Sequence, residues 1–352
     1  MKRILIFGRS YPHVAHGYIN NDVEYIASRA SVLVLSPSQP TAPFYSSIDF
    51  NYFRNIKELI AQARQFKPDF IVCWLLPNHH YARLVAETLG IPFILKLHTP
   101  DFHTLFPARR PIKKRLACHV FNDAKLSHYY LISIRSLRRT AASKQFRGAF
   151  CIPALKTAFT KFFPERKIFE LTPRIFYSRF HNEETNGERA LILGSLVSRR
   201  EGEFEFNSAL SSIKEPLDWY PVPTPGLLLL DIPNIPSNIT IKKFVPNIEM
   251  AKVYKNYKAL IVIGDSKYSR GLPLSILEAQ AAGVCVIVPS LRPDFDKFVT
   301  DGGGYIFNDE SEIQGLLDQI PDQSIREKGF QHAKLFDISG LSKELSRVAL
   351  EL

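Results

Sequence analysis

The amino-acid sequence predicts an α/β protein made of two Rossmann-like, doubly wound domains. The chain has 352 residues, more than one hydrophobic core usually serves. Short apolar runs alternate with helical stretches of ten or more residues, which is the pattern of a parallel sheet covered on both faces. This alternation is interrupted at the polar, apolar-poor stretch 181–188 and then starts again, so we place a hinge near that stretch.

The elements follow one another in a regular order. In the first half we expect strands at 2–8, 31–36, 70–76 and 92–98, and helices at 18–28, 56–66 and 80–90. In the second half we expect strands at 189–195, 258–264 and 284–290, and a helix at 273–283. Two doubly wound domains that face one another across a cleft are therefore the expected architecture.

Composition indicates a soluble, cytoplasmic protein. Hydrophobic residues make up 45% of the chain and charged residues 22%, as in ordinary globular proteins. The first ten residues hold four consecutive apolar residues, too few for a signal peptide. The longest apolar runs, 70–76 and 226–230, cannot span a bilayer. Four widely spaced cysteines favour reduced, buried thiols.

The positive charge is concentrated in the first half. Residues 1–165 contain 23 Lys and Arg against 9 Asp and Glu, and residues 96–161 contain 14 against 2. Such an asymmetry indicates an anionic partner for the first half. Nucleic acid is a weak candidate, because the sequence shows no RNA-binding motif and no platform of interleaved aromatic and basic residues.

In open parallel sheets, ligands bind at the carboxyl ends of the strands, so the loops there are candidate sites. Three such loops in the first half carry histidines. The first holds His13 and His16 together with Gly17, the second holds His79 and His80, and the third holds His98 and His103. A single histidine in a loop is more often solvated or a helix cap. Three histidine loops at one sheet edge favour a lined cleft. Asn78 could cap the helix beginning near His79.

The strongest candidate is the stretch RGLPLSILEAQAAG at 270–283. Gly271 permits close backbone approach, and Pro273 suits a first helical turn because its missing N–H costs nothing there. The N–H groups of that turn and the helix dipole favour phosphate. Glu278, about one turn further on, could reach a ligand hydroxyl, although spacing alone does not exclude an ordinary solvated helix glutamate.

This stretch resembles the donor-site signature of family 4 retaining glycosyltransferases of the GT-B fold. Matches fall at Gly271, Pro273, Glu278, Ala279, Gly283 and Val284. The resemblance continues through 193–202 and 238–264, and through the first-half segments YPHVAHGYINNDVEYIA, LKLHTPDF and LISIRSLRRTAA. It covers most of the chain and is closest to family members that build bacterial surface polysaccharides.

The resemblance implies a domain plan. Residues 1–170 would form an acceptor domain and residues 171–335 a nucleotide-sugar donor domain. The final helix, within 336–352, would cross back to complete the first domain. The apolar spacing of Leu341, Leu345, Val348 and Leu352 suits a helix that packs on one face.

The resemblance also implies roles for individual residues. The protein would transfer a sugar from a nucleotide-diphosphate donor to a polysaccharide or lipid-linked acceptor, with retention and without a metal. Glu278 would hold the ribose hydroxyls, and His98 would lie near the reacting sugar. Donor contacts would come from Gly17, Ser195, Arg200, Gly271, Leu272, Pro273, Leu274 and Glu278. Acceptor contacts would come from His13, His16, His79, His80 and His103.

Two positions depart from the family pattern. The first signature glutamate is Arg270 here, and the family's diphosphate-binding arginine is Ser195. We expect Arg270 to replace the lost positive charge, binding the donor diphosphate or a carboxylate on an acidic donor sugar. The alternative is a catalytically silent GT-B protein that serves as a binding or scaffold subunit in polysaccharide assembly.

Two further sequence features need an interpretation. Asp294 and Asp296 imitate the metal motif of another glycosyltransferase fold but follow the signature helix, so we interpret them as solvated turn acids. Basic residues cluster at 108–147, where a solvated charged face is one reading. The other is peripheral docking on the inner face of an anionic membrane, as a lipid-linked acceptor would require.

Overall fold

The computed structural model describes the greater part of the chain. The described residues are 1–8, 11–12, 16–39, 47–98, 135–184, 187–193, 210, 213–220, 236–262, 272–291, 293–320 and 323–351. The residues named above that lie outside these ranges are His13, His103, Ser195, Arg200, Arg270, Gly271 and Leu352. Most of the basic stretch 108–147 lies outside them as well.

The chain divides into two compact units. The first contains residues 1–13, 22–172 and 341–352, and the second contains residues 14–21 and 173–340. The division therefore passes through the first helix, α1 (Gly17–Ala27). The C-terminal residues group with the first unit, and Leu341, Leu345 and Val348 are buried there.

The first unit is built on a seven-stranded parallel sheet in the order β3-β2-β1-β4-β5-β6-β7. Its strands are β1 (Arg3–Phe7), β2 (Ser31–Ser36), β3 (Phe50–Tyr52), β4 (Phe70–Trp74), β5 (Phe93–Leu97), β6 (Phe146–Cys151) and β7 (Ile168–Glu170). Every residue of β4 and β5 is buried, as expected for central strands with helices on both faces.

The second unit has a six-stranded parallel sheet in the order β10-β9-β8-β11-β12-β13. Its strands are β8 (Arg189–Leu193), β9 (Leu217–Tyr220), β10 (Ile239–Ile241), β11 (Tyr257–Ile261), β12 (Cys285–Pro289) and β13 (Tyr305–Phe307). Both sheets place their earliest strand beside a later one across a topological switch point, which is the doubly wound arrangement. The predicted fold class of two Rossmann-like domains is confirmed.

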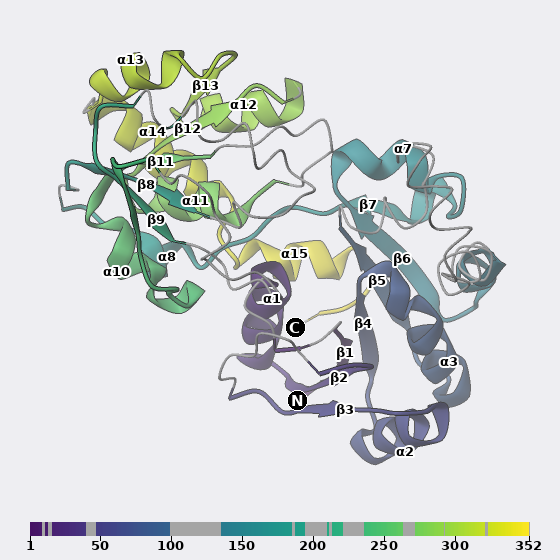
Figure 1. The fold of residues 1–352 in the computed structure, drawn as a ribbon. Coiled ribbons are helices and arrows are strands. Elements are labelled where there is room, and N and C mark those ends of the chain that lie inside the picture. The colour runs from purple at the N-terminus through teal and green to yellow at the C-terminus, as the bar shows by residue number, and fades with distance from the viewer. Residues whose placement is uncertain are drawn as a thin grey trace, which may run out of the picture. The chain divides into compact units, whose positions relative to one another are not determined.

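Helices cover both faces of the second sheet (Figure 1). One face packs against α8 (Tyr177–Phe180), α10 (Met250–Tyr254), α11 (Leu274–Ala281), α12 (Pro293–Asp301) and α14 (Gln323–Leu335). The opposite face packs against α13 (Glu312–Asp318) and the apolar residues Leu210 and Ile213. The α11 helix buries six of its eight residues, so packing fixes its position.

The first unit also has helices on both sides of its sheet. The helices α2 (Ile56–Phe66) and α3 (His79–Leu89) pack against each other. The helices α1 and α15 (Gly340–Ser346) lie on the other side of the sheet (Figure 1). A short helix, α7 (Lys156–Phe159), precedes β7.

A buried ion cluster joins three of these elements. Lys96 in β5 is 1% exposed, and its Nζ lies 2.5 Å from Asp22 Oδ2 of α1 and 3.2 Å from Glu344 Oε1 of α15. Nζ also lies 4.7 Å from the centre of the Trp74 ring in β4. Burial opposes the charge, but the two carboxylates outweigh it and raise the pKa of Lys96. The cluster ties the N-terminal and C-terminal helices to a central strand.

Several details differ from the sequence expectations. The last helix, α15, ends at Ser346, so Val348 lies beyond it. The strand expected at 70–76 ends at Trp74, and a 3₁₀ turn (Leu76–Asn78) follows it. Asn78 occupies the N-cap position of α3, but its side chain makes no capping hydrogen bond, and its Nδ2 donates to the Trp74 carbonyl at 3.0 Å. Asp294 and Asp296 lie in the first turn of α12. Asp296 accepts hydrogen bonds from Ser290 Oγ and Leu291 N, so its carboxylate stabilises the helix start.

We expect Lys96→Met to destabilise the first unit by about 3–5 kcal/mol, because it leaves two buried carboxylates without their cation. The chain's two tryptophans lie one in each unit, so urea unfolding of a Trp219→Phe background reports the first unit through Trp74. Lys297→Met is the control, since Lys297 is exposed and pairs with Asp301 one turn away on α12. Equal midpoints for the two variants would contradict the expectation.

Candidate functional site

The carboxyl edge of the second sheet carries the residues with the strongest sequence signal. The strand β8 pairs with β9 on one side and β11 on the other. The crossovers after β8 and β11 leave in opposite directions, and this opens a crevice at such an edge. Ser195 and Arg200 follow β8, while Arg270 and Gly271 follow β11. These four residues lie outside the described ranges. The start of α11, directly after Gly271, lies within them.

The start of α11 has the backbone of a helix N-terminus. Pro273 occupies the N-cap position with extended angles, φ −69° and ψ 132°, and Leu274 is the first helical residue. Leu272 and Leu274 are partly buried against the core of this unit. Apolar anchors on both sides of Pro273 hold the first turn in place. The backbone N–H groups of this turn are thereby fixed at the sheet edge, where that of Ile276 donates to the Pro273 carbonyl at 3.2 Å.

Glu278 lies one turn after Leu274 and is 3% exposed. Its Oε1 accepts a hydrogen bond from Asn247 Nδ2 at 2.9 Å, the one such contact that it makes with the described residues. Burial raises the pKa of Glu278 to about 7, although the Asn247 bond and the charge of Arg179 favour the carboxylate. A buried carboxyl group with this pKa is typical of a functional site rather than of a solvated helix face.

Two neighbours of Glu278 were not predicted from the sequence. Asn247 precedes α10, in the segment between β10 and that helix. Tyr254 in α10 is fully buried, and its pKa is raised by burial and by the charge of Glu278. Asn247 carries no local signal, because an isolated Asn after a proline is an ordinary turn residue. Its role depends on a partner 31 residues further along the chain.

A second set of contacts holds α11 against α14. Gln280 is buried, and its Oε1 lies 2.9 Å from Nδ1 of His332 on α14. A Cβ on Gly302 would overlap the Gln280 side chain, and one on Gly329 would lie 3.2 Å from the Gln280 carbonyl. Gly329 is part of α14, so its missing side chain lets α14 approach the backbone of α11 closely. The site helix is therefore immobilised on both sides.

Three histidine-bearing loops follow adjacent strands of the first unit's sheet. The strands β1, β4 and β5 are neighbours in the sheet, so the loops after them leave the same edge. His79 is buried at the start of α3, with Nδ1 2.5 Å from the Leu76 carbonyl. Burial lowers the pKa of His79 to about 4 and also lowers the pKa of the half-buried His80. Their rings meet edge to face at 5.7 Å.

The remaining described candidates lie at the ends of their elements. His98 follows β5 directly, and burial lowers its pKa to about 4, so its imidazole is neutral at physiological pH. His16 precedes α1, and its carbonyl accepts from the N–H groups of Ile19 and Asn20. Gly17 groups with the second unit, where a Cβ on it would lie 3.6 Å from Leu274 Cδ1.

Within the described ranges, no group of three or more His, Cys, Asp or Glu side chains is placed to hold a metal ion. No helix among the described residues is long and apolar enough to cross a membrane. Cys73, Cys151 and Cys285 are buried. Burial raises the pKa of Cys151 and of Cys285 to about 12, so these two thiols are inert.

Comparison with solved structures identifies the fold. HepE (Alr3699) from Anabaena, solved with UDP-glucose, matches with a TM-score of 0.71 and 11% identity over 99% of each chain. Sucrose-phosphate synthase from Thermosynechococcus elongatus matches with a TM-score of 0.67 and 12% identity, over 99% of this chain and 98% of that one. WaaG, a glycosyltransferase involved in lipopolysaccharide biosynthesis, matches with a TM-score of 0.66 and 13% identity, over 98% of this chain and 99% of that one.

These proteins are GT-B glycosyltransferases, so the predicted GT-B fold is confirmed. No family model and no curated protein matches the sequence. At identities this low, the likeness shows the fold, and the function is argued from the site.

Glu278 gives a direct test of the site's electrostatics. The folded-state pKa of about 7 lies above the ordinary value of 4.5 for a glutamate, so the fold favours the protonated form. The second unit should therefore lose roughly 3 kcal/mol of stability as pH rises from 4.5 to 7. Glu278→Gln should remove this slope and make the unit more stable than the parent at pH 8.

Urea unfolding of a Trp74→Phe background, in which Trp219 reports the second unit, measures this stability. Glu249→Gln is the control, because Glu249 is an exposed glutamate beside Asn247. A Glu278→Gln variant with the parent's pH slope would show that Glu278 is not the titrating group.

Proposed function

We propose that the protein is a glycosyltransferase that moves a sugar from a nucleotide-diphosphate donor to a polysaccharide or lipid-linked acceptor, with retention of configuration. The observation that carries the proposal is Glu278. It is a buried carboxyl group one turn into a helix that starts at the carboxyl edge of the second sheet. The GT-B fold supports the proposal, because the same architecture in HepE was solved with UDP-glucose.

The donor would bind with its ribose on Glu278 and its diphosphate at the start of α11. A carboxylate accepts two hydrogen bonds from vicinal hydroxyls, and the charge assists both. A pKa of about 7 leaves a large carboxylate fraction at neutral pH, and two hydroxyl donors would favour ionisation further. Ligand binding would thus relieve the cost of keeping this group buried.

Cations and helix N–H groups would stabilise the leaving diphosphate, so the proposal includes no metal. The α11 N-terminus carries a partial positive charge. Arg270 directly precedes Gly271, and Arg200 lies in the segment after β8. Positive groups aimed at the departing phosphate lower the barrier, because charge develops on that oxygen in the transition state.

His98 would contact the reacting sugar as a neutral imidazole. Its low pKa, caused by burial, removes a cationic form at physiological pH. A neutral imidazole can donate through one ring nitrogen and accept through the other. It can therefore orient a sugar hydroxyl without attracting the diphosphate away from α11. His13, His16, His79, His80 and His103 would contribute to the acceptor side.

The acceptor proposal depends on charge. Within the described residues 135–170, nine are basic and two are acidic, and Arg135, Arg138, Arg139, Lys144 and Arg147 are all exposed. An anionic leaflet attracts each such cation by about 1 kcal/mol. Peripheral docking on the inner face of the membrane, by residues 108–147, would bring a lipid-linked acceptor to the enzyme.

The second candidate function is a catalytically silent binding or scaffold subunit. Arg270 and Ser195 favour it, because both replace residues that the family pattern uses at the donor site. The two functions differ in one observable. A transferase releases nucleoside diphosphate from a nucleotide sugar, whereas a silent subunit binds it unchanged or does not bind it.

Arg270→Ala should weaken donor binding on the order of ten- to a hundredfold, because it removes a charge-assisted contact. A thermal-shift screen of nucleoside diphosphates and their sugars selects the donor, and calorimetry measures its affinity. Lys328→Ala, an exposed lysine on α14, is the control for loss of one positive charge. If Arg270→Ala binds the donor as tightly as the parent, Arg270 does not replace the missing cation. Binding without release of nucleoside diphosphate would favour the silent subunit.

The double variant Arg138→Glu/Arg139→Glu should bind anionic vesicles at least about tenfold more weakly than the parent. Co-sedimentation with phosphatidylglycerol vesicles at low salt measures this. Lys57→Glu/Arg64→Glu makes the same charge change at exposed positions of α2 in the same unit. Equal losses for the two double variants would mean that net charge alone matters and that this surface does not dock.

A further inference from the structure

A polar pocket lies in the second unit, apart from the α11 start. It has a volume of about 390 Å³ and is bounded by α8, by the residues directly after α8, and by α14. This volume is within the range of small-molecule sites. Its lining combines aromatic rings with charged and amide side chains, and the donor-site proposal uses none of these residues.

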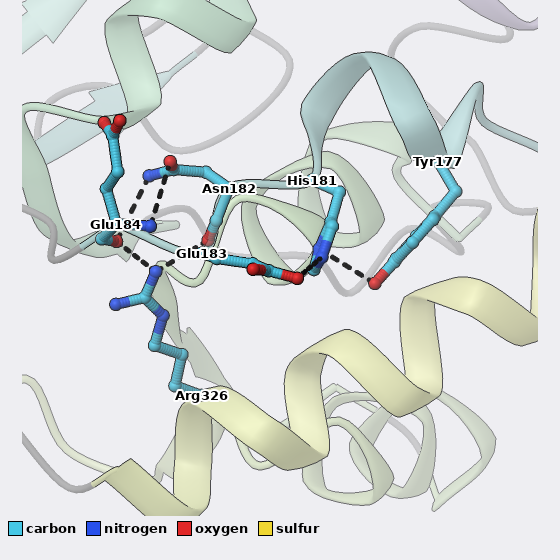
Figure 2. A network of polar contacts seen from close by, with 6 residues as sticks. All are labelled: Tyr177, His181, Asn182, Glu183, Glu184 and Arg326. Carbon is cyan, nitrogen blue, oxygen red and sulfur yellow. Dashed lines mark hydrogen bonds and ion pairs between the residues drawn. The ribbon is translucent and has the colours of Figure 1, made fainter.

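One wall of the pocket is a chain of hydrogen bonds (Figure 2). The Tyr177 hydroxyl lies 2.9 Å from His181 Nδ1, and His181 Nε2 lies 3.4 Å from Glu183 Oε1. Because a carboxylate only accepts, Nε2 carries the proton and Nδ1 accepts from the phenol. Burial and the charges of Glu183 and Glu327 raise the pKa of Tyr177, which keeps the phenol protonated. The 2.9 Å bond thus orients the Tyr177 and His181 side chains toward each other, and the exposed Glu183 lies at the end of the chain.

Aromatic rings supply the apolar part of the lining. The Tyr177 and His181 rings stack at 4.9 Å with an interplanar angle of 22°, and Phe330 meets His181 edge to face at 4.7 Å. Arg326 reaches from α14 to donate to the carbonyls of Asn182 and Glu184 (Figure 2). That contact fixes the segment after α8 against α14, so the aromatic wall is preformed.

The charges of the lining cancel. Glu183 and Glu327 are acidic, whereas Arg326 and Lys334 are basic. A phosphate or other anion would meet the two carboxylates, and an organic cation would meet the ammonium and guanidinium groups. Gln323 and Gln331 add neutral donors and acceptors. The lining therefore favours neither an anion nor a cation and suits a neutral ligand that has many hydroxyl groups and one apolar face.

We propose that this pocket binds a pyranose unit of a glycan, separately from the donor site. A pyranose ring presents C–H groups on one face, which pack on Phe330 and the Tyr177–His181 stack. Its hydroxyls donate to the carboxylates and accept from the amide and ammonium groups. The inference rests on the proposed function in one respect, that a glycan is the molecule available to this protein. The pocket would then hold a sugar of the acceptor or product chain.

Saturation-transfer NMR with the methyl α- and β-pyranosides of glucose, galactose and mannose tests the proposal on the full chain. We expect transfer to at least one pyranoside, in the millimolar range and unchanged by saturating UDP. Phe330→Ala should weaken it by about three- to tenfold. Gln331→Ala, at an exposed position where folding is not at stake, should weaken it as well. Leu335→Ala is the control, because Leu335 is 74% exposed on the same helix and does not line the pocket.

The proposal is overturned if no pyranoside receives saturation from the parent. It is also overturned if both lining variants bind like the Leu335→Ala control, or if UDP abolishes the transfer. Pyranoside binding in Glu278→Gln separates the two hypotheses. If Glu278→Gln still binds the pyranoside but no longer binds the nucleotide, both sites are supported. If the parent binds the pyranoside but binds no nucleotide, the pocket is supported and the donor site is refuted.

Discussion

The constraint on which the site depends is the parallel pairing of β8 with both β9 and β11. Parallel strands must all end at the same edge, so the segments after β8 and β11 and the start of α11 all leave that edge. The sheet order of the first unit repeats this arrangement around β1. A doubly wound chain thus brings residues that are distant in sequence to one sheet edge, although no local sequence pattern specifies a contact between them.

Buried charge distinguishes structure from function in this molecule. Lys96 is neutralised by Asp22 and Glu344. Asp218 in β9 is likewise satisfied, by Arg189 at 2.5 Å, Lys242 at 3.2 Å and the Tyr257 hydroxyl at 2.7 Å. The charges of Lys96 and Asp218 are both compensated by neighbouring groups, so their burial is explained by the fold alone.

Glu278 differs, because among the described residues its hydrogen-bond partner is a single amide, that of Asn247. Keeping an ionisable group buried with so little compensation lowers the stability of the free protein. The pKa of about 7 expresses that cost. A ligand with two hydroxyl donors would supply further compensation, and for this reason we propose Glu278 as a ligand-binding residue.

Periodicity and composition were sufficient to predict the long elements. The strand at 31–36 and the helix at 56–66 were predicted at their observed bounds, because each is a continuous apolar run or an amphipathic stretch with clear ends. The short strands were harder. The sequence of β6, FRGAFC, contains an arginine and a glycine, and β9, LDWY, contains a buried aspartate. Their stability comes from neighbouring strands and from non-local partners of Asp218, which no local pattern encodes.

The candidate site was predictable in part. Glycine, proline and glutamate at fixed spacing identified α11, but the spacing left Glu278 open to a solvated reading, and burial resolved it. Asn247 and Lys96 could not be interpreted from sequence alone. The partner of Asn247 lies 31 residues away, and those of Lys96 lie 74 and 248 residues away. The pocket beside α8 is similar, since it combines residues 177–183 with residues of α14.

The central claim is that the Glu278 carboxylate holds the ribose of a nucleoside diphosphate. The most direct test compares, by calorimetry, the nucleoside diphosphate that binds best with its 2′,3′-dideoxy analogue, in the parent and in Glu278→Ala. The account predicts that the parent binds the analogue about tenfold or more weakly, and that Glu278→Ala binds the two ligands equally. Equal affinities in the parent, or the parent's preference persisting in Glu278→Ala, would contradict it.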